Sequence, residues 1–213
     1  MPVVALVGNK GGAGKTTLCV NLAAALAERA PTVILDADPQ GSALQWRALG
    51  DRDDAVSVVA AAVGLKEMIR VYRAGWQYIV IDCPPSVQAL QTEQVLGLCD
   101  LALIPVQPSP LDIWAAVHIE DRVADARRGN SGLRAVLVIN QLEPRTTLSR
   151  LMRRALAELG LPAARTAIGR RVAYRTSMLD GRSVMDLGSR GRAAADEIRQ
   201  LIAEVIIEEE IRA

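Results

Sequence analysis

One loop restricts the fold of this chain more than any other feature of its sequence. The loop reads Gly8-Asn9-Lys10-Gly11-Gly12-Ala13-Gly14-Lys15-Thr16-Thr17. It follows the apolar run Pro2–Val7 and leads into a helical pattern over Lys15–Arg29. Glycines allow backbone N–H groups to turn inward around phosphate oxygens, and the N-terminus of a following helix favours the same negative charge. An apolar strand, a Gly-rich loop and a helix in this order predict a phosphate-binding βα unit.

Two side chains of the loop add chemistry that glycines alone do not supply. The spacing places Lys15 to reach the β and γ phosphates of a nucleotide, and the Thr16 hydroxyl to bind Mg²⁺. The usual phosphate-loop pattern has Gly where Asn9 stands, but Gly14-Lys15-Thr16 is intact. An ordinary Gly-rich turn would need neither the lysine nor the hydroxyl. We therefore expect nucleotide contacts from Gly11, Gly12, Ala13, Gly14, Lys15, Thr16 and Thr17.

Short apolar runs alternate with helical patterns along the rest of the chain. Strands are predicted over Pro2–Val7, Thr32–Asp36, Gln77–Asp82, Leu101–Val106 and Ala135–Asn140, with a weaker one over Val56–Ala61. Helices are predicted over Lys15–Arg29, Leu65–Arg73, Val87–Leu98, Leu111–Arg128, Leu148–Leu159 and Ala193–Glu209. Strands separated by helices indicate a parallel sheet with right-handed crossovers. The predicted fold is α/β: a single doubly wound, mostly parallel sheet flanked by helices, of the P-loop NTPase type, in one domain over residues 1–213.

Composition argues against several other classes of protein. Aromatic residues make up only 3% of the chain, too few for a surface that stacks the bases of single-stranded nucleic acid. The three cysteines have no C-x-x-C spacing, which argues against a disulfide framework, a zinc ribbon or an iron–sulfur site. The longest uncharged run, Thr16–Ala27, is too short to cross a bilayer, and no signal peptide precedes the first predicted strand. We therefore expect a cytoplasmic protein.

Carboxylates follow the ends of two predicted strands. Asp36 and Asp38 close the second strand, and Asp82 closes the strand that begins at Gln77. Because the carboxyl ends of parallel strands meet at one edge of a sheet, these side chains are expected beside the phosphate loop. A strand-end carboxylate can instead cap the N-terminus of a helix. Two such strand ends next to a phosphate loop favour a shared site.

Three segments in this order resemble the ParA/MinD family of ATPases. Lys10–Thr16 resembles the deviant Walker A box, whose signature is the second lysine at the place of Lys10; Asp36–Gln40 resembles the second box, and Ile79–Pro85 the Walker B strand. The resemblance implies a slow, Mg²⁺-dependent ATP hydrolase that a partner stimulates. By this resemblance the catalytic residues are Lys10, Lys15 and Asp38, and the Mg²⁺ ligands, direct or through water, are Thr16, Asp36 and Asp82. Lys10 would reach the partner subunit's phosphates in an ATP-bound homodimer, and Asp38 would position the attacking water.

Later segments extend the resemblance over nearly the whole chain. Asn140 stands where the family places an adenine-binding Asn, although an Asn at a strand end can also close it with an Asx turn. Arg170–Asp186 resembles the family's C-terminal stretch. It departs from that pattern at Thr176-Ser177, where the family often has Glu-Ala. Asn140 is therefore the expected base-binding residue.

Positive charge is concentrated in one third of the chain. Residues 122–192 carry 15 arginines and five acidic side chains, a net charge of +10, whereas the whole chain has a net charge of +1. Clustered guanidinium groups attract phosphate, although a charge run can also be a solvated face with nothing bound. In a chain that resembles this family, the charge favours non-specific duplex DNA. The candidate DNA-binding residues are Arg153, Arg154, Arg170, Arg171, Arg190 and Arg192.

The C-terminal pattern separates the functional classes within the family. The predicted helix has an apolar stripe at 198, 201, 202, 205 and 206. Its polar face carries Glu204 and Glu208–Glu210, and anionic lipid would repel these carboxylates. We expect this helix to dock on the core rather than on a membrane. The predicted function is a ParA-like, nucleoid-associated ATPase that positions a cargo through an adaptor, ParB-like or equivalent. The cargo would be a plasmid or chromosome partition complex or a protein organelle such as a carboxysome. The alternatives are a MinD-like membrane-cycling regulator and a nucleotide-gated scaffold with little hydrolysis.

Overall fold

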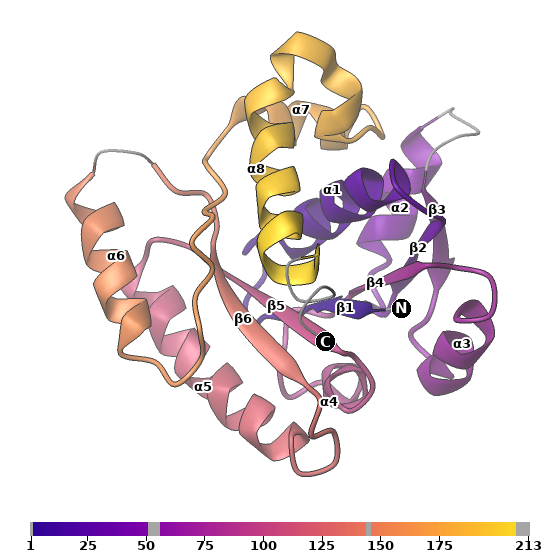
Figure 1. Cartoon of the computed structure of the whole chain (residues 1–213), viewed down its shortest axis with the longest axis horizontal. Helices are drawn as coiled ribbons and strands as arrows, with labels where there is room; N and C mark the ends of the chain where they lie inside the picture. Colours follow the sequence, from indigo (N-terminus) through magenta and orange to yellow (C-terminus); the bar gives the residue numbers. More distant parts are fainter. Residues whose placement is uncertain (1, 51–55, 144–145, 208–213) are drawn as a thin grey trace.

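Six strands form one sheet at the centre of the molecule (Figure 1). The structure, a computed structural model, describes residues 2–50, 56–143 and 146–207. The strands are β1 (Val3–Leu6), β2 (Thr32–Asp36), β3 (Ser57–Ala60), β4 (Tyr78–Asp82), β5 (Leu101–Val106) and β6 (Arg134–Ile139). Their order is β3-β2-β4-β1-β5-β6, and all pairings between these described strands are parallel. The predicted α/β fold is confirmed.

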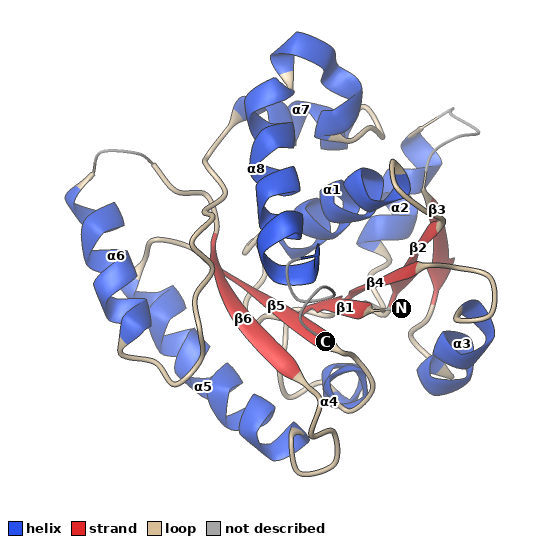
Figure 2. Cartoon of the chain, viewed as in Figure 1, coloured by secondary structure: helices blue, strands red, loops and turns tan. Residues whose placement is uncertain are grey.

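Helices cover both faces of the sheet (Figure 2). One layer holds α1 (Lys15–Ala27), α2 (Ser42–Leu49), α7 (Val172–Leu179) and α8 (Arg192–Ile202), and the other holds α3 (Leu65–Tyr72), α4 (Leu90–Leu96), α5 (Pro110–Ala126) and α6 (Thr147–Ala157). Because both faces are covered, β1, β4 and β5 are buried along their whole lengths. The edge strand β3 is partly exposed. The core is therefore two apolar layers, one on each face of the sheet.

The strand register brings the functional side chains to one edge of the sheet. Asp36 of β2 lies opposite Asp82 of β4, and Leu6 of β1 lies opposite the same Asp82. The phosphate loop begins directly after β1, so it leaves the sheet beside both carboxylates. From there α1 runs back over one face, while α4, which follows β4, packs on the other. Ligand sites of open α/β sheets lie at such a point.

The predicted elements match the structure closely, with three omissions. The predicted strand over Thr32–Asp36 and the one over Leu101–Val106 have these same bounds in the structure, and the other strands differ by a residue or two at their ends. The helices α2 and α7 and the 3₁₀ helix η1 (Val184–Arg190) were not predicted. The helix predicted over Ala193–Glu209 ends its α-helical part at Ile202 and continues as a π-helical turn, η2 (Ala203–Ile207). Residues 208 and 209 of that prediction lie outside the described part of the chain.

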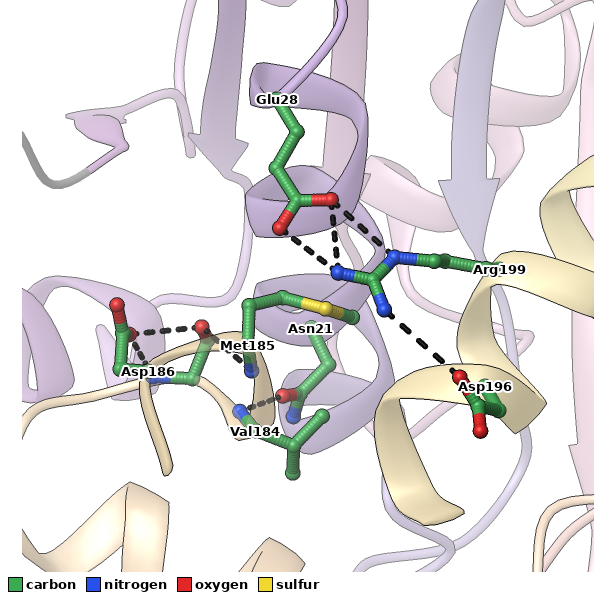
Figure 3. A network of polar contacts seen from close by, with 8 residues as sticks. Asn21, Glu28, Val184, Met185, Asp186, Asp196 and Arg199 are labelled. Atoms are coloured by element: carbon green, nitrogen blue, oxygen red, sulfur yellow. Dashed lines mark hydrogen bonds and ion pairs between the residues drawn. The ribbon is translucent and has the colours of Figure 1, made fainter. Parts of the chain in front are cut away.

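Polar contacts fix the C-terminal stretch to α1, the helix that follows the phosphate loop (Figure 3). The Asn21 side-chain oxygen accepts a hydrogen bond from the Val184 backbone N–H at 2.7 Å. Glu28, just after α1, pairs with Arg199 of α8 at 3.0 Å. These contacts join parts of the chain that are more than 160 residues apart, and they tie η1 and α8 to the helix that follows the phosphate loop.

The apolar stripe of the C-terminal helix lies in the core. Its five members are buried in the layer that also contains α1: Ile198, Leu201, Ile202, Val205 and Ile206. The expectation that this helix docks on the core is confirmed for the residues that the structure describes. Among those residues, no helix combines the length and hydropathy that a bilayer-crossing segment requires.

Candidate nucleotide site

Two left-handed glycines shape the phosphate loop. Gly12 has φ +77° and Gly14 has φ +87°, conformations that L side chains rarely adopt. A Cβ atom on Gly14 would lie 2.4 Å from the Asn140 side-chain nitrogen. That nitrogen donates to the Ala13 carbonyl at 2.7 Å, so the end of β6 holds the loop from behind. The loop is therefore a backbone cradle with no room for a side chain at Gly14.

Lys15 lies beneath the loop with its charge turned inward. Its side chain is buried, and Nζ donates to the Lys10 carbonyl at 3.1 Å. Desolvation by burial lowers the pKa of Lys15, and the nearby carboxylates, Asp82 first, act in the opposite direction. A nearby phosphate group would stabilise the charged form of this buried ammonium, because it supplies the opposite charge. The geometry agrees with the predicted contact of Lys15 with nucleotide phosphates.

Thr16 and Asp82 form the part of the site that fits a divalent cation. The Thr16 hydroxyl donates to Asp82 Oδ2 at 2.6 Å, and the Asp82 carboxyl is fully buried. Its other oxygen, Oδ1, has no hydrogen-bond partner among the described residues. Burial raises the pKa of Asp82 to about 7, against the effect of the Thr16 hydrogen bond. An orphaned carboxylate oxygen beside a hydroxyl suits Mg²⁺, which takes hard oxygen ligands and completes its shell with water and phosphate.

No larger metal-binding cluster competes with this assignment within the described residues, where no three His, Cys, Asp or Glu side chains gather around a common point. A few protein oxygens plus substrate phosphates are typical of Mg²⁺ sites. The chemistry of the donors therefore fits the expected cofactor.

Asp36 and Asp38 stand at the same edge but differ in what they contact. Asp36 Oδ2 accepts the backbone N–H groups of Ala43 and Leu44, both at 3.0 Å, and Oδ1 accepts that of Asp38 at 3.2 Å. The helix-capping role that strand-end carboxylates can take is thus present at Asp36, toward α2. Burial raises the pKa of Asp36, and these backbone hydrogen bonds act against the shift. The role of Asp36 in the Mg²⁺ shell stays a prediction.

Asp38 is the more accessible of the two. It is half-buried, and its Oδ1 accepts the Gln40 backbone N–H at 2.9 Å. This hydrogen bond occupies one carboxylate oxygen and leaves the other, Oδ2, to accept from a water molecule. The arrangement agrees with the predicted role of Asp38 toward the attacking water, which stays a prediction.

Lys10, at the other end of the loop from Lys15, points outward. Its side chain is 47% exposed, and Nζ pairs with Asp112 Oδ2 at 3.1 Å. Asp112 lies in the first turn of α5 and is itself 4% exposed. The two lysines of one loop thus serve different places: Lys15 the inside of the cradle, and Lys10 the surface beside α5.

A cavity of about 150 Å³ adjoins the loop. Its lining comes from the start of α1, the end of β6, the segment 168–171 and α7: Gly14, Thr17, Leu18, Asn140, Gln141, Ile168, Gly169, Arg170, Arg171, Tyr174 and Arg175. Apolar groups, side-chain amides and three arginines line this space directly beside the phosphate cradle, and a mixed lining of this kind suits a base and its sugar. Asn140, the expected base-binding residue, lies in this lining, although its amide nitrogen is already bonded to Ala13.

The six candidate DNA-binding arginines do not form one patch. Arg170 and Arg171 line the cavity and pair with Glu143 and Glu197, each at 2.6 Å. Arg153 and Arg154 are exposed on α6, where Arg153 also donates to the Arg165 carbonyl at 3.3 Å. Arg190 and Arg192, at the end of η1 and the start of α8, are exposed and form no ion pair with any described residue.

The two exposed pairs therefore lie over opposite faces of the sheet, because α6 packs in one layer and α8 in the other. The fold thus separates the arginines of residues 122–192. Arg170 and Arg171 line the cavity, and the two exposed pairs lie on two separate surfaces. DNA binding by any of these arginines stays a prediction.

Sequence reasoning missed several side chains that complete the site. Gln107 donates to the Gly12 carbonyl at 2.6 Å, and Gln141, which has φ +56°, lines the cavity. Asp112 holds Lys10 although 102 residues separate them. Gln107 and Gln141 directly follow predicted strands, and that position is the one signal that could have found them. Nothing local to Asp112 indicates its partner.

Comparison with known proteins places this site in context. The sequence profile of the CobQ/CobB/MinD/ParA nucleotide binding domain matches residues 4–184. The chain is 39% identical over 206 residues to a protein of Halothiobacillus neapolitanus named maintenance of carboxysome distribution protein A, with 95% of each chain covered.

Solved structures share the fold. One is a variant of the Cyanothece protein McdA in complex with ATP, with a TM-score of 0.75, 16% identity and 95% of each chain covered. Another is the septum site-determining protein MinD of Pyrococcus horikoshii with Mg-ADP, with a TM-score of 0.75, 19% identity and coverage of 100% of this chain and 98% of that one. Both solved proteins hold an adenine nucleotide.

Proposed function

The chain belongs to the CobQ/CobB/MinD/ParA family of nucleotide-binding proteins, and from that membership we propose that it is a ParA-type ATPase. In this proposal the chain binds ATP with Mg²⁺, dimerises when ATP is bound and hydrolyses ATP slowly. The ATP dimer binds duplex DNA without sequence preference and carries a cargo through an adaptor protein. Its place of work would be the nucleoid surface in the cytoplasm.

The observation that carries the proposal is the different placement of the two lysines of the loop, one buried and one exposed. Lys15 is buried below the cradle, where the β and γ phosphates would lie, and needs no second subunit to do its work. Lys10 is half-exposed and faces outward beside α5, so within its own chain it contacts Asp112 instead of the cradle. A phosphate group of a second subunit is an anion that an outward-facing lysine can reach.

The residues divide the chemistry among them. The backbone of the loop and Lys15 would bind and orient the phosphates, while Thr16 and Asp82 would hold Mg²⁺, which when bound neutralises charge on the transferring phosphoryl group. Asp38 would orient the water for in-line attack. Lys10 from the second subunit would stabilise the charge that develops in the transition state, as an arginine finger does. Hydrolysis would then depend on dimerisation.

The cargo is proposed from sequence likeness. The Halothiobacillus protein is named for the distribution of carboxysomes, and it is similar to this chain over 95% of both lengths. We extend that cargo class, a protein organelle, to this chain, with a separate adaptor between the ATPase and the organelle. Among the six candidate arginines, the exposed pairs Arg153/Arg154 and Arg190/Arg192 are the ones we propose for contact with DNA phosphates.

Sedimentation velocity on single variants tests the proposal. With ATP and Mg²⁺ the unaltered chain should dimerise, and with ADP it should stay monomeric. Lys15→Ala should lose nucleotide binding, because the phosphates lose their buried ammonium. Lys10→Ala should still bind ATP as a monomer but fail to form a stable, hydrolysing dimer.

Lys66→Ala is the matched control for loss of a lysine. Lys66 is exposed on α3, on the far side of the sheet from α1, and its alanine variant should dimerise and hydrolyse ATP as the unaltered chain does. A Lys10→Ala variant that forms a normal, active dimer would remove the role of this lysine in the partner's site. Binding of the ATP form to anionic liposomes in place of DNA would move the chain to the MinD-like class.

A further inference from the structure

One side of the cavity beside the phosphate loop is formed by the segment from Ile168 to Arg171 and by Tyr174 of α7. This segment has no regular secondary structure of its own apart from an isolated bridge between Leu142 and Gly169. Two backbone hydrogen bonds join it to Leu142, one from the Leu142 N–H to the Ile168 carbonyl at 2.9 Å. A third backbone hydrogen bond, from the Ile168 N–H to the Ile139 carbonyl at 2.8 Å, ties the start of the segment to β6. Side-chain contacts therefore matter most for the rest of the wall, from Gly169 to Tyr174.

A single carboxylate on α8 contacts three members of the wall. Glu197 Oε2 accepts the Gly169 backbone N–H at 3.2 Å. Glu197 Oε1 accepts two hydrogen bonds from the Arg171 guanidinium, at 3.0 Å from Nε and 2.6 Å from the terminal nitrogen. The Tyr174 hydroxyl lies 3.2 Å from Oε2 and 3.1 Å from the Ala194 carbonyl.

Two features favour the hydrogen bonds between Glu197 and the wall. The Glu197 side chain is 16% exposed, so its ion pair with Arg171 is partly shielded from solvent. Burial, and secondly the Glu197 charge, raise the pKa of Tyr174, which therefore keeps its proton and acts as a donor. Glu197 is not part of the cavity lining itself. Its effect on a ligand must pass through the residues that it holds.

The helix that carries Glu197 is rigidly placed. Its neighbour Ile198 is fully buried in the core, and Arg199 pairs with Glu28 next to α1, as Figure 3 shows. Asp196 also pairs with Arg199, at 3.8 Å. The carboxylate thus stands on an element that is tied to the helix of the phosphate loop, so it can set the distance between the cavity wall and that loop.

We propose that Glu197 is a positioning residue for nucleoside binding: through Gly169, Arg171 and Tyr174 it holds the cavity wall where the base and sugar of ATP bind. The phosphate cradle has no contact with Glu197, because its contacts come from the loop itself and from residues at the ends of β4, β5 and β6. This inference rests on the ATP binding proposed above. It predicts that the carboxylate matters for the nucleoside end of the ligand and not for the phosphate end.

The chain offers a close structural match for a control. Glu204, in the π-helical turn after α8, is 15% exposed and also accepts backbone N–H groups of the preceding loop, from Arg165 at 2.6 Å and Thr166 at 2.9 Å. It lies outside the cavity lining. Glu204→Ala removes a comparable set of hydrogen bonds at a place outside the cavity. It therefore measures how far the loss of such contacts alone changes ligand binding.

The test compares two ligands that share phosphates but differ in the nucleoside. Dissociation constants for Mg-ATP and for Mg-tripolyphosphate are measured by calorimetry on the unaltered chain, Glu197→Ala, Glu197→Gln and Glu204→Ala. Thermal melting of each nucleotide-free protein shows that it is folded. We expect Glu197→Ala to weaken ATP binding about tenfold or more, which is about 1.4 kcal/mol, and to leave tripolyphosphate binding within about twofold.

The ATP affinity of Glu197→Gln should fall between that of the unaltered chain and that of Glu197→Ala. Its amide oxygen still accepts hydrogen bonds, but the second acceptor oxygen is replaced by a donor and the charge that pairs with Arg171 is lost. Glu204→Ala should bind both ligands as the unaltered chain does. An equal loss for ATP and tripolyphosphate in Glu197→Ala, or no loss for either, overturns the inference while the proposed function stands. An unaltered chain that binds tripolyphosphate as tightly as ATP, or binds neither, overturns the proposed ATP site and this inference with it.

Discussion

At the scale of single residues, the site buries charged groups whose burial is costly. Bound phosphate and Mg²⁺ would supply the opposite charges and offset that cost. Lys15 and Asp82 are both buried. Burial lowers the pKa of Lys15 and raises the pKa of Asp82, and both shifts favour the uncharged form. A protein that worked without a bound anion and cation would gain little from such an arrangement. Perturbed groups of this kind, grouped at a strand edge, are typical of functional sites.

Asp38→Asn tests the role of the accessible carboxylate. Asparagine keeps a side-chain oxygen that can accept the Gln40 N–H, so the local turn should survive. ATP and Mg²⁺ should bind as before, because water positioning acts on the transition state and not on ground-state binding. Hydrolysis of bound ATP, measured in a single turnover, should slow by about 10²-fold or more. Weaker ATP binding with unchanged turnover per bound ATP would instead make Asp38 a binding residue.

Asp82→Asn tests the cost of the buried carboxylate through its pH dependence. Burial raises the pKa of Asp82 to about 7 from an ordinary value of 3.8. Between these values the folded chain holds a proton that the unfolded chain has released, so this group stabilises the fold at low pH. That contribution is lost as pH rises toward 7, at up to about 1.4 kcal/mol per pH unit, and is constant above it.

Urea unfolding of the nucleotide-free proteins at about pH 5, 6, 7 and 8 brackets this pKa and measures the effect. The free energy of unfolding of Asp82→Asn relative to the unaltered chain should grow from the lowest pH up to the pKa, because the amide cannot ionise. With Mg²⁺ and ATP present the order should reverse, since only the unaltered chain gains full ligand binding. A constant difference between the two proteins across the pH range would contradict the assigned burial cost.

At the scale of the elements, two glycines control how the C-terminal stretch docks. Gly50 ends α2, and Gly181 lies in the turn between α7 and η1. A Cβ on Gly181 would clash with the Gly50 backbone nitrogen, and Gly181 has φ +61°. Next to this contact, the Trp46 indole donates to the Arg182 carbonyl at 3.1 Å. The backbone approach brings α7, a wall of the cavity, against α2, which Asp36 caps.

Gly181→Ala should therefore destabilise the protein more than an alanine at a comparable open glycine. Gly64 has φ +72° and nothing lies within 4 Å of the place a Cβ would take, so Gly64→Ala carries the backbone strain alone, about 1–2 kcal/mol. Gly181→Ala adds the clash with Gly50, about 1–3 kcal/mol more. Chemical denaturation of both variants measures the difference. Equal losses for the two would mean that the close approach is not maintained.

The strands and long helices were predictable because their apolar patterns are local. β2 and β5 have the predicted bounds, since continuous apolar runs of this length are typical of strands buried on both faces. The omitted helices are short and bury few side chains: Ala43 and Trp46 in α2, and Tyr174 and Ser177 in α7. These helices are held by contacts with distant parts of the chain, which no local sequence pattern indicates.

The site shows the same division. Lys15, Thr16 and Asp82 were predictable because a loop motif and strand ends place them together in any parallel sheet. The pair of Lys10 and Asp112 was not, because 102 residues separate the two partners and no local pattern links the loop after β1 to the helix after β5. Arg170 and Arg171 were assigned to DNA from clustered charge in a chain that resembles the ParA/MinD family. The structure places them on the cavity and beside Glu143 and Glu197.

At the scale of the whole molecule, the proposed function is a switch between a monomer and a DNA-binding dimer. In the monomer Lys10 is held by Asp112 of its own α5. In the ATP dimer it would leave that contact for the phosphates of the second subunit. A two-fold dimer presents each exposed arginine pair twice, so its affinity for DNA rises by avidity without any new residue. ATP binding and DNA binding would then be coupled through dimerisation.

The most direct test is the binding of two unrelated DNA duplexes, followed by fluorescence anisotropy over a salt series with ATP or with ADP. We expect tight binding with ATP, weak binding with ADP and the same affinity for both duplexes. Arg190→Ala combined with Arg192→Ala should reduce the slope of log K against log salt by up to about two per subunit, since each phosphate contact contributes about 0.9. Arg153→Ala with Arg154→Ala applies the same test to the opposite face. Equal binding with ATP and ADP, or a strong preference for one duplex, would contradict the proposed switch.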